Sequence, residues 1–173
     1  MLTKERIHAQ MHTLEEKTGL QFNDITWLTQ AMDSTPLPKE PTDGKHKKTD
    51  CNNTALATVG DAVLKAILAD RLFKGNLKKG QITILKQELE RNSTLHRIQM
   101  KEELLQYAYN DHGFFDDPHQ DHQKVATSAK HPSYIEATVA AIYYDKGFDE
   151  AKKWVNDYLF PRLWKEAFNT ELP

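Results

Sequence analysis

The segment between Asn52 and Phe73 constrains the fold most, because it reads as one long helix with a glycine and an aspartate at its centre. Its apolar side chains recur at three- and four-residue spacing, the pattern of an amphipathic helix. Gly60 costs such a helix about 1 kcal/mol relative to alanine, and the Asp61 carboxylate is expensive to bury without a partner. The sequence therefore predicts close packing at Gly60 and a specific role for Asp61.

Helical spacing also precedes this segment. A first helix over residues 3–18 is expected to end before Gly19. A second helix follows within FNDITWLTQAM, where Asn23 or Asp24 can cap its first turn because a short polar side chain accepts hydrogen bonds from free backbone N–H groups.

The remainder of the chain is also predicted to be helical. Residues 81–104 keep a three- to four-residue apolar spacing, with a break near Asn92. The strongly apolar SYIEATVAAIYYDKG is expected to stop at Gly147, and one or two helices with a joint near Pro161 follow. No alternating pattern of useful length predicts a strand. The predicted fold class is all-α, in a single domain over residues 1–173.

Two polar stretches are predicted to be loops, over about residues 33–51 and 110–131. The first is rich in proline and lysine, which favours a solvated linker over a binding site. The second is rich in histidine and aspartate, which could bind zinc or another transition metal. The irregular spacing of these side chains favours an exposed polar loop. The candidate ligands are Asp111, His112, Asp116, Asp117, His119, Asp121, His122 and His131.

Composition limits the compartment and the class of partner. The net charge of −2 gives no global electrostatic attraction for nucleic acid, although it leaves room for a local basic surface. No apolar run is long enough to span a membrane, and the N-terminal segment lacks the apolar core of a signal peptide. The single cysteine, Cys51, suits a reducing compartment. We therefore expect a cytoplasmic protein with no membrane partner.

Four blocks in order resemble the catalytic domain of ribonuclease III, and the resemblance runs from about Leu14 to Leu163. It implies an all-helical fold that forms a homodimer. It also implies endonucleolytic hydrolysis of double-stranded RNA that depends on Mg²⁺ or Mn²⁺. The blocks are GDAVL from Gly60, Asn92 with Thr94 and Leu95, Glu136 with Ala137, and AAIYYDKGF.

The resemblance also implies which residues form the site. Carboxylates hold the metal ions in this family, since hard divalent cations prefer oxygen ligands. Asp61 and Glu136 match two of the family's acidic positions, which makes them the candidate catalytic residues and metal ligands. Thr54 and Ser133 are weaker candidate ligands that offer hydroxyl groups. Four positions that are acidic in the family are neutral here, at Thr54, Ala57, Gln81 and Ser133.

Two interpretations of this reduced site remain open. In the first, Asp61 and Glu136 hold one metal ion with help from water, a nearby hydroxyl or a loop acid, and the protein cleaves RNA. In the second, Lys65 pairs with Asp61, because residues four apart share a helix face. The protein is then a non-catalytic RNA-binding or scaffold homologue. A protein adaptor without any RNA role is a third hypothesis.

Basic residues gather around the second block and could contact RNA phosphates, which gives affinity without sequence preference. A solvated helical face balanced by nearby acids fits this pattern equally well. The predicted RNA-binding residues are Lys74, Lys78, Lys79, Lys86, Arg91 and Arg97. With the chain ending at Pro173, we expect no C-terminal double-stranded-RNA-binding domain. This layout is similar to that of mini-ribonuclease III, which relies on its dimer surface or on a protein partner.

Overall fold

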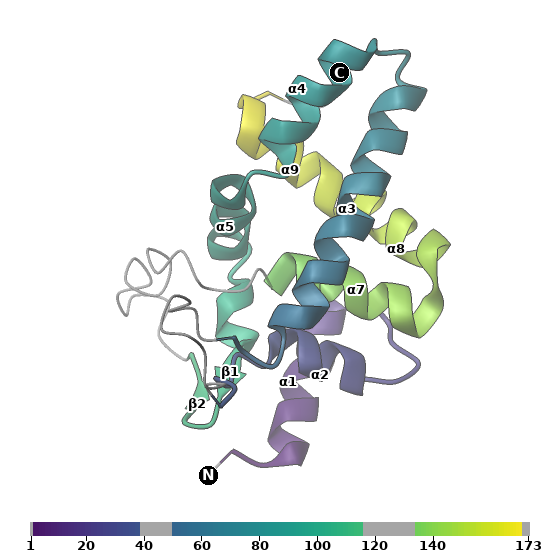
Figure 1. Ribbon diagram of the computed structural model, residues 1–173. Coiled ribbons are helices and arrows are strands. Elements are labelled where there is room, and N and C mark those ends of the chain that lie inside the picture. Colours follow the sequence, from purple (N-terminus) through teal and green to yellow (C-terminus); the bar gives the residue numbers. More distant parts are fainter. Residues whose placement is uncertain (1, 39–49, 116–133, 171–173) are drawn as a thin grey trace.

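The computed structural model describes residues 2–38, 50–115 and 134–170. Helices dominate these residues, which confirms the predicted all-α class (Figure 1). The described residues also include one short 3₁₀ helix (η1), one π-helical turn (η2) and two very short strands. The elements are α1 (Lys4–Thr18), α2 (Thr26–Met32), α3 (Thr54–Lys74), α4 (Lys79–Leu89), α5 (Asn92–Lys101), η1 (Leu104–Tyr107), β1 (Tyr109–Asn110), β2 (Gly113–Phe114), α7 (Tyr134–Lys146), α8 (Phe148–Trp154), η2 (Val155–Leu159) and α9 (Phe160–Phe168).

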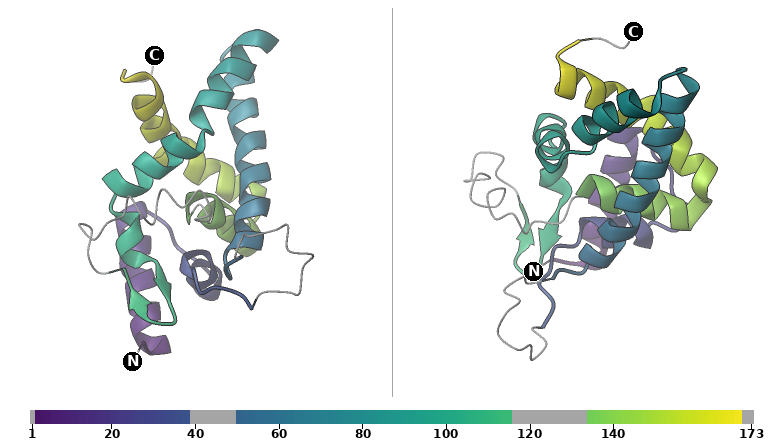
Figure 2. Two further views of the ribbon diagram at one scale, coloured as in Figure 1. Left: turned by 60° about the vertical axis from the view of Figure 1, so that its left-hand side comes forward. Right: turned by 45° about the horizontal axis from the view of Figure 1, so that its top comes forward.

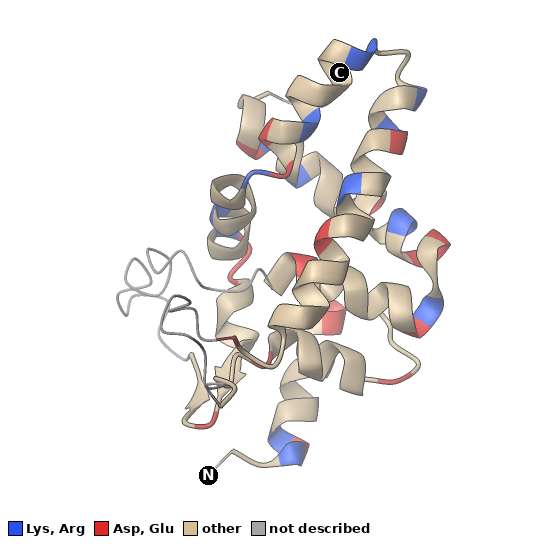
Figure 3. Ribbon diagram, viewed as in Figure 1, with Lys and Arg blue, Asp and Glu red and all other residues tan. Residues whose placement is uncertain are grey.

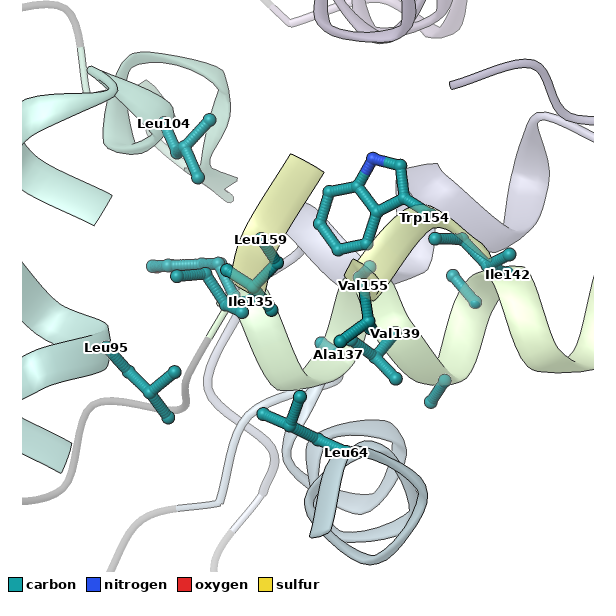
Figure 4. Packing of buried hydrophobic residues seen from close by; sticks show 14 of the residues in the cluster. Leu64, Leu95, Leu104, Ile135, Ala137, Val139, Ile142, Trp154, Val155 and Leu159 are labelled. Carbon is teal, nitrogen blue, oxygen red and sulfur yellow. The ribbon is translucent and has the colours of Figure 1, made fainter. Parts of the chain in front are cut away.

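The first part of helix α7, residues 134–142, is the centre of the core, because every side chain there except that of Glu136 is buried. A helix that is apolar on every side needs neighbours around its whole circumference. Those neighbours are α2, α3 and α8. Figure 4 shows Ile135 and Val139 of α7 between Leu64 of α3 and Val155 and Leu159 of the terminal helical segment. The core therefore joins elements from both ends of the chain.

Glycines end two of the helices where the sequence predicted. Gly19 follows α1 with a φ of 67°, and its N–H donates to the carbonyl oxygen of Glu15. Gly147 follows α7 with a φ of 89°. Glycine adopts these left-handed backbone angles without the steric cost that a Cβ atom would bring. Both predicted helix ends are confirmed.

Helix α2 begins at Thr26, slightly later than the sequence suggested. The Asp24 carboxylate accepts hydrogen bonds from the Thr26 N–H at 3.0 Å and from the Thr26 hydroxyl at 2.6 Å. Asp24 thus satisfies a free N–H at the start of the helix, although the N-cap position is Ile25 and not Asn23 or Asp24 as predicted. The Asp145 carboxylate accepts from the backbone N–H groups of Asn23 and Asp24, at 2.7 and 2.9 Å, and so ties this turn to α7.

The predicted helix break near Asn92 is confirmed. Helix α4 ends at Leu89 and α5 begins at Asn92, with the intervening Arg91 in an extended conformation. The Thr94 hydroxyl donates to the carbonyl oxygen of Glu88 at 3.0 Å, which satisfies one acceptor at the end of α4. In Figure 1 and in the left view of Figure 2, α4 and the C-terminal half of α3 extend together beyond the helices around α7.

A π-helical turn connects α8 to α9 just before Pro161, close to the predicted joint. Proline lacks an N–H group, and its ring crowds the carbonyl one turn earlier. The wider π turn accommodates that interruption without breaking the helical path. Helix α9 is held to α5 by Glu166, whose carboxylate pairs with Arg97 at 2.5 Å and also with Lys101.

The strands β1 and β2 form a small antiparallel hairpin that the sequence did not predict. Strands of two residues are too short to show an alternating pattern. The hairpin also holds part of the first predicted loop, because the Ser34 N–H donates to the carbonyl oxygen of Tyr109 at 2.8 Å. Most of the two predicted loops lies outside the described residues. No helix in the described part of the chain has both the length and the apolar character needed to cross a membrane.

Candidate functional site

The crossing of α3 and α7 brings the two predicted catalytic residues together. A Cβ atom added to Gly60 would lie 1.6 Å from the carbonyl oxygen of Glu136, so only glycine allows the helices to approach this closely. The next residue along α3 is Asp61, whose carboxylate acts electrostatically on Glu136. Figure 3 shows acidic positions on both helices at this crossing. The predicted reason for Gly60 is therefore confirmed.

Asp61 has a partner within its own helix. The Lys65 ammonium donates a hydrogen bond to Asp61 Oδ2 at 2.7 Å. The side chains are 37% exposed for Asp61 and 43% exposed for Lys65, so the pair is open to solvent. This hydrogen bond raises the pKa of Lys65, and the nearby charges of Glu90 and Glu136 raise it further. The predicted pairing of Lys65 with Asp61 is confirmed.

The pKa of Glu136 is shifted by its surroundings. Burial raises the pKa of Glu136 to about 7, and the negative charge of Asp61 acts in the same direction. The positive charge of Lys65 lowers this pKa and so opposes part of the effect. A buried carboxylate beside a second carboxylate is costly to ionise unless a cation is close. The site consequently favours positive charge at the helix crossing.

Glu90 also belongs to this electrostatic environment. It lies at the end of α4, and its charge acts on both Lys65 and Glu136. The Glu90 carboxylate pairs with Lys86 at 2.7 Å. From the sequence, Glu90 was expected only to be one of the nearby acids that balance a solvated helical face. The predicted helix break next to Glu90 was the sequence feature that could have indicated that its charge acts on α3.

Three of the four positions at which the sequence resemblance implies an acid have structural roles here. Ala57 is 6% exposed and packs in the core. Thr54 lies at the start of α3, where its hydroxyl oxygen accepts from the Cys51 N–H at 2.9 Å. The Gln81 side chain accepts from the Lys78 N–H at 3.0 Å and caps α4. Ser133 lies outside the described residues.

The residues present do not fit the carboxylate metal site that the sequence resemblance implies. In the described ranges, no group of three or more His, Cys, Asp or Glu side chains is arranged to hold a metal ion. Mg²⁺ requires oxygen ligands in near-octahedral geometry, whereas Asp61 is already paired with Lys65. The role of Asp61 and Glu136 as metal ligands therefore stays a prediction. Most candidate ligands of the 110–131 loop lie outside the described residues, and only Asp111 and His112 lie within them.

Four of the six predicted RNA-binding residues form ion pairs within the protein. Lys74 pairs with Asp70 at 3.1 Å, Lys86 with Glu90 at 2.7 Å, Arg91 with Glu88 at 2.5 Å and Arg97 with Glu166 at 2.5 Å. The remaining two, Lys78 and Lys79, are exposed at the start of α4 and have no ion-pair partner within the described residues. Free positive charge in this set is therefore concentrated at the junction between α3 and α4.

Comparison with known protein families shows to which family the chain belongs. Residues 43–163 match the family described as Ribonuclease-III-like. The chain belongs to the ribonuclease-III-like family. This match spans α3 and α7 with their crossing, and it confirms the resemblance that the sequence blocks indicated.

Individual ribonuclease III relatives agree with this assignment. The chain is 29% identical over 147 residues to Ribonuclease 3 of Clostridium acetobutylicum. The aligned region covers 84% of this chain and 59% of that relative. It is 31% identical over 142 residues to Ribonuclease 3 of Dehalococcoides mccartyi. Here the aligned region covers 81% of this chain and 56% of that relative. The chain thus spans somewhat more than half the length of these curated relatives.

A solved structure shows the same fold. The nuclease domain of ribonuclease III from Campylobacter jejuni aligns with a TM-score of 0.63 and 20% identity, covering 92% of this chain and 99% of that domain. That structure is described as flexible in a region involved in dimer formation. The alignment extends across nearly the whole ribonuclease-III-like chain, including segments outside residues 43–163.

Proposed function

We propose that this protein binds double-stranded RNA through a single ribonuclease III-type domain and that the family's cleavage reaction is strongly impaired in it. The pairing of Asp61 with Lys65 at 2.7 Å carries this proposal. The Lys65 ammonium group is paired with the Asp61 carboxylate, which would otherwise be available to hold a metal ion. Ala57 adds to the argument, since its methyl side chain has no atom that can bind a cation.

The free lysines at the start of α4 support contact with RNA. Lys78 and Lys79 are adjacent and exposed, and they lie where α4 extends away from the core. Two neighbouring ammonium groups can contact successive phosphates along one strand of a duplex. An A-form duplex is recognised mainly by shape and backbone, so such contacts are sufficient for binding without base readout.

The outer face of α3 supports a homodimer. This face carries no charge over most of its length, and Phe73 at its end is 69% exposed. Small and apolar side chains allow a second helix to approach closely, so a second copy of this chain is the partner that we propose. The exposed residues on this face are Ala55, Thr58, Ala62, Ala66 and Phe73.

A second candidate function is metal-dependent endonucleolytic cleavage of double-stranded RNA, with Mg²⁺ or Mn²⁺ at Asp61 and Glu136. The raised pKa of Glu136 favours it, because a carboxylate that is costly to ionise gains most from a cation. The reaction class is phosphodiester hydrolysis. We further propose a cytoplasmic location, which agrees with the free thiol of Cys51.

Labelled duplex RNA distinguishes the two functions. Gel shifts measured with EDTA should show duplex binding by the natural protein, and a single strand of the same sequence should compete poorly. Incubation with Mg²⁺ or Mn²⁺ should then leave the duplex intact. Cleavage that Asp61→Asn and Glu136→Gln both abolish would replace the proposed function with the second one. Absence of duplex binding would contradict both.

A further inference from the structure

We propose that the Lys65 ammonium is a built-in counter-ion that takes the place of a divalent metal ion at the crossing of α3 and α7. Lys65 then supplies positive charge to the carboxylates of this crossing without any bound metal, by pairing with Asp61 and offsetting part of the cost of ionising Glu136. The inference deepens the proposed function because it concerns the same carboxylates. Its test uses no RNA, so it stands or falls independently of RNA binding.

The position of the ammonium is fixed by the helix that carries it. Lys65 follows Asp61 by four residues on α3, so both side chains leave the same face of the helix. The Lys65 Nζ atom lies 2.7 Å from Asp61 Oδ2, which is a direct charge-assisted hydrogen bond. A metal ion bound to this oxygen would have to displace the ammonium or approach it closely.

Three acidic side chains surround this ammonium electrostatically. Asp61 contacts it directly, while Glu90 and Glu136 act on it through their charges. Lys86 pairs with Glu90 at 2.7 Å and neutralises one of the three. Lys65 thus acts on Asp61 and Glu136 together. A divalent ion added beside it would experience the repulsion of a positive charge within a few ångströms.

A second lysine–aspartate pair on the same helix shows what is particular to Lys65. Lys74 pairs with Asp70 at 3.1 Å with the same four-residue spacing. Asp70 has another cation, Lys152, at 2.6 Å. The Lys74 pair therefore lies in a basic environment, whereas the Lys65 pair lies beside further carboxylates. Both pairs share the helical spacing, but of the two only the Lys65 pair is also acted on by the charges of Glu90 and Glu136.

Removal of the Lys65 charge tests the inference. Lys65→Gln should leave Asp61 and Glu136 without a counter-ion, and Mg²⁺ can bind through one or two carboxylates together with water. We expect millimolar Mg²⁺ or Mn²⁺ to raise the melting temperature of this variant with a saturable dependence. Electron paramagnetic resonance of Mn²⁺ should show binding at least about tenfold tighter than to the natural protein.

Three variants serve as controls. Lys65→Arg keeps the positive charge and should behave like the natural protein. Lys74→Gln removes a lysine with the same helical spacing and should gain no metal response, since Lys152 still pairs with Asp70. The double variant Lys65→Gln with Glu136→Gln should lose the metal response that Lys65→Gln gains.

Two results would overturn the inference. The first is saturable Mn²⁺ binding by the natural protein that Glu136→Gln abolishes, because a metal would then bind despite Lys65. The second is a folded Lys65→Gln variant without any metal response. Circular dichroism establishes folding. If Lys65→Gln does not fold, the comparison of the natural protein with Glu136→Gln decides, since absence of Mn²⁺ binding by both supports the inference.

Discussion

The backbones of Gly60 and Glu136 are in direct contact where α3 crosses α7. A methyl group on Gly60 would lie 1.6 Å from the Glu136 carbonyl oxygen, closer than any non-bonded contact allows. Because that oxygen belongs to the backbone, no side-chain rotation can relieve the overlap. The two helices that carry Asp61 and Glu136 are therefore held at the separation that this glycine sets.

Gly60→Ala should accordingly destabilise the protein. The substitution forces α3 away from α7, and overpacking of this kind typically costs about 1–3 kcal/mol or more. We expect a loss of at least about 3 kcal/mol in the free energy of unfolding, because the core as well as the site depends on this contact. Urea denaturation followed by circular dichroism measures it.

Gly80→Ala is the matched control for that experiment. Gly80 also lies inside a helix, and a Cβ atom there would meet nothing within 4 Å. Its replacement should raise the free energy of unfolding by up to about 1 kcal/mol, the difference in helix propensity. Equal effects of the two substitutions would contradict the importance of the helix crossing.

Glu136→Gln should change how stability depends on pH. The pKa of Glu136 is raised from 4.5 to about 7, so the folded protein binds this proton more tightly than the unfolded chain. The resulting stabilisation is fully present below about pH 4.5 and is lost as the pH rises through about 7. Glutamine does not ionise, so the variant should be more stable than the natural protein at about pH 8, by up to about 3 kcal/mol.

Urea denaturation between acidic and mildly alkaline pH measures this difference. The two proteins should approach each other in stability at the acidic end of the range. Glu150→Gln is a suitable control, because Glu150 is exposed and lies on α8 instead of on the two crossing helices. Parallel pH profiles for the natural protein and Glu136→Gln would show that Glu136 ionises as freely in the fold as outside it.

Reversal of charge at Lys78 and Lys79 should weaken duplex RNA binding. These are the predicted RNA-binding lysines without an ion-pair partner in the described residues. The double change to glutamate should lower affinity by at least about tenfold and reduce the dependence of log affinity on log salt by about one to two. Fluorescence anisotropy at several salt concentrations measures both quantities.

Arg91→Gln should have a smaller effect on the same measurement, since Glu88 already neutralises Arg91. Lys153→Glu, on the exposed side of α8, should leave binding nearly unchanged. A larger loss from Arg91→Gln than from the double change would place the RNA on α5 instead of the start of α4.

Ala62→Arg should convert the proposed homodimer into a monomer. Ala62 is exposed in the middle of the uncharged face of α3, so a long charged side chain there would separate two packed copies. Light scattering coupled to size-exclusion chromatography measures the mass. Thr83→Arg, on the exposed surface of α4, should leave the mass unchanged. A natural protein that is monomeric at micromolar concentration would rule out the proposed interface.

Local features of the fold could be predicted from the sequence because their signals are local. Gly19 and Gly147 end their helices through a backbone conformation that glycine adopts readily. The Asp61–Lys65 pair follows from a spacing of four residues on one helix. The hairpin of β1 and β2 gave no such signal, since its strands contain two residues each.

The electrostatic state of the basic residues could not be predicted in the same way. Arg97 pairs with Glu166, which lies 69 residues later in the chain. No helical spacing connects the two, and only the packing of α9 on α5 brings them together. Glu90 likewise acts on Glu136 through the fold and not through sequence proximity. Charge that looks free in a sequence is therefore a poor guide to charge that is free on the surface.

The central position of α7 in the core has a consequence for synthesis on the ribosome. Leu64 on α3 and Leu28 on α2 are both covered in the finished protein, and α7 is the helix that joins these segments. While residues up to 115 leave the ribosome, this partner is still absent, and the earlier helices expose an apolar surface. Stable packing must wait until Tyr134–Lys146 has emerged, and until then the exposed apolar surface makes the nascent chain prone to aggregation.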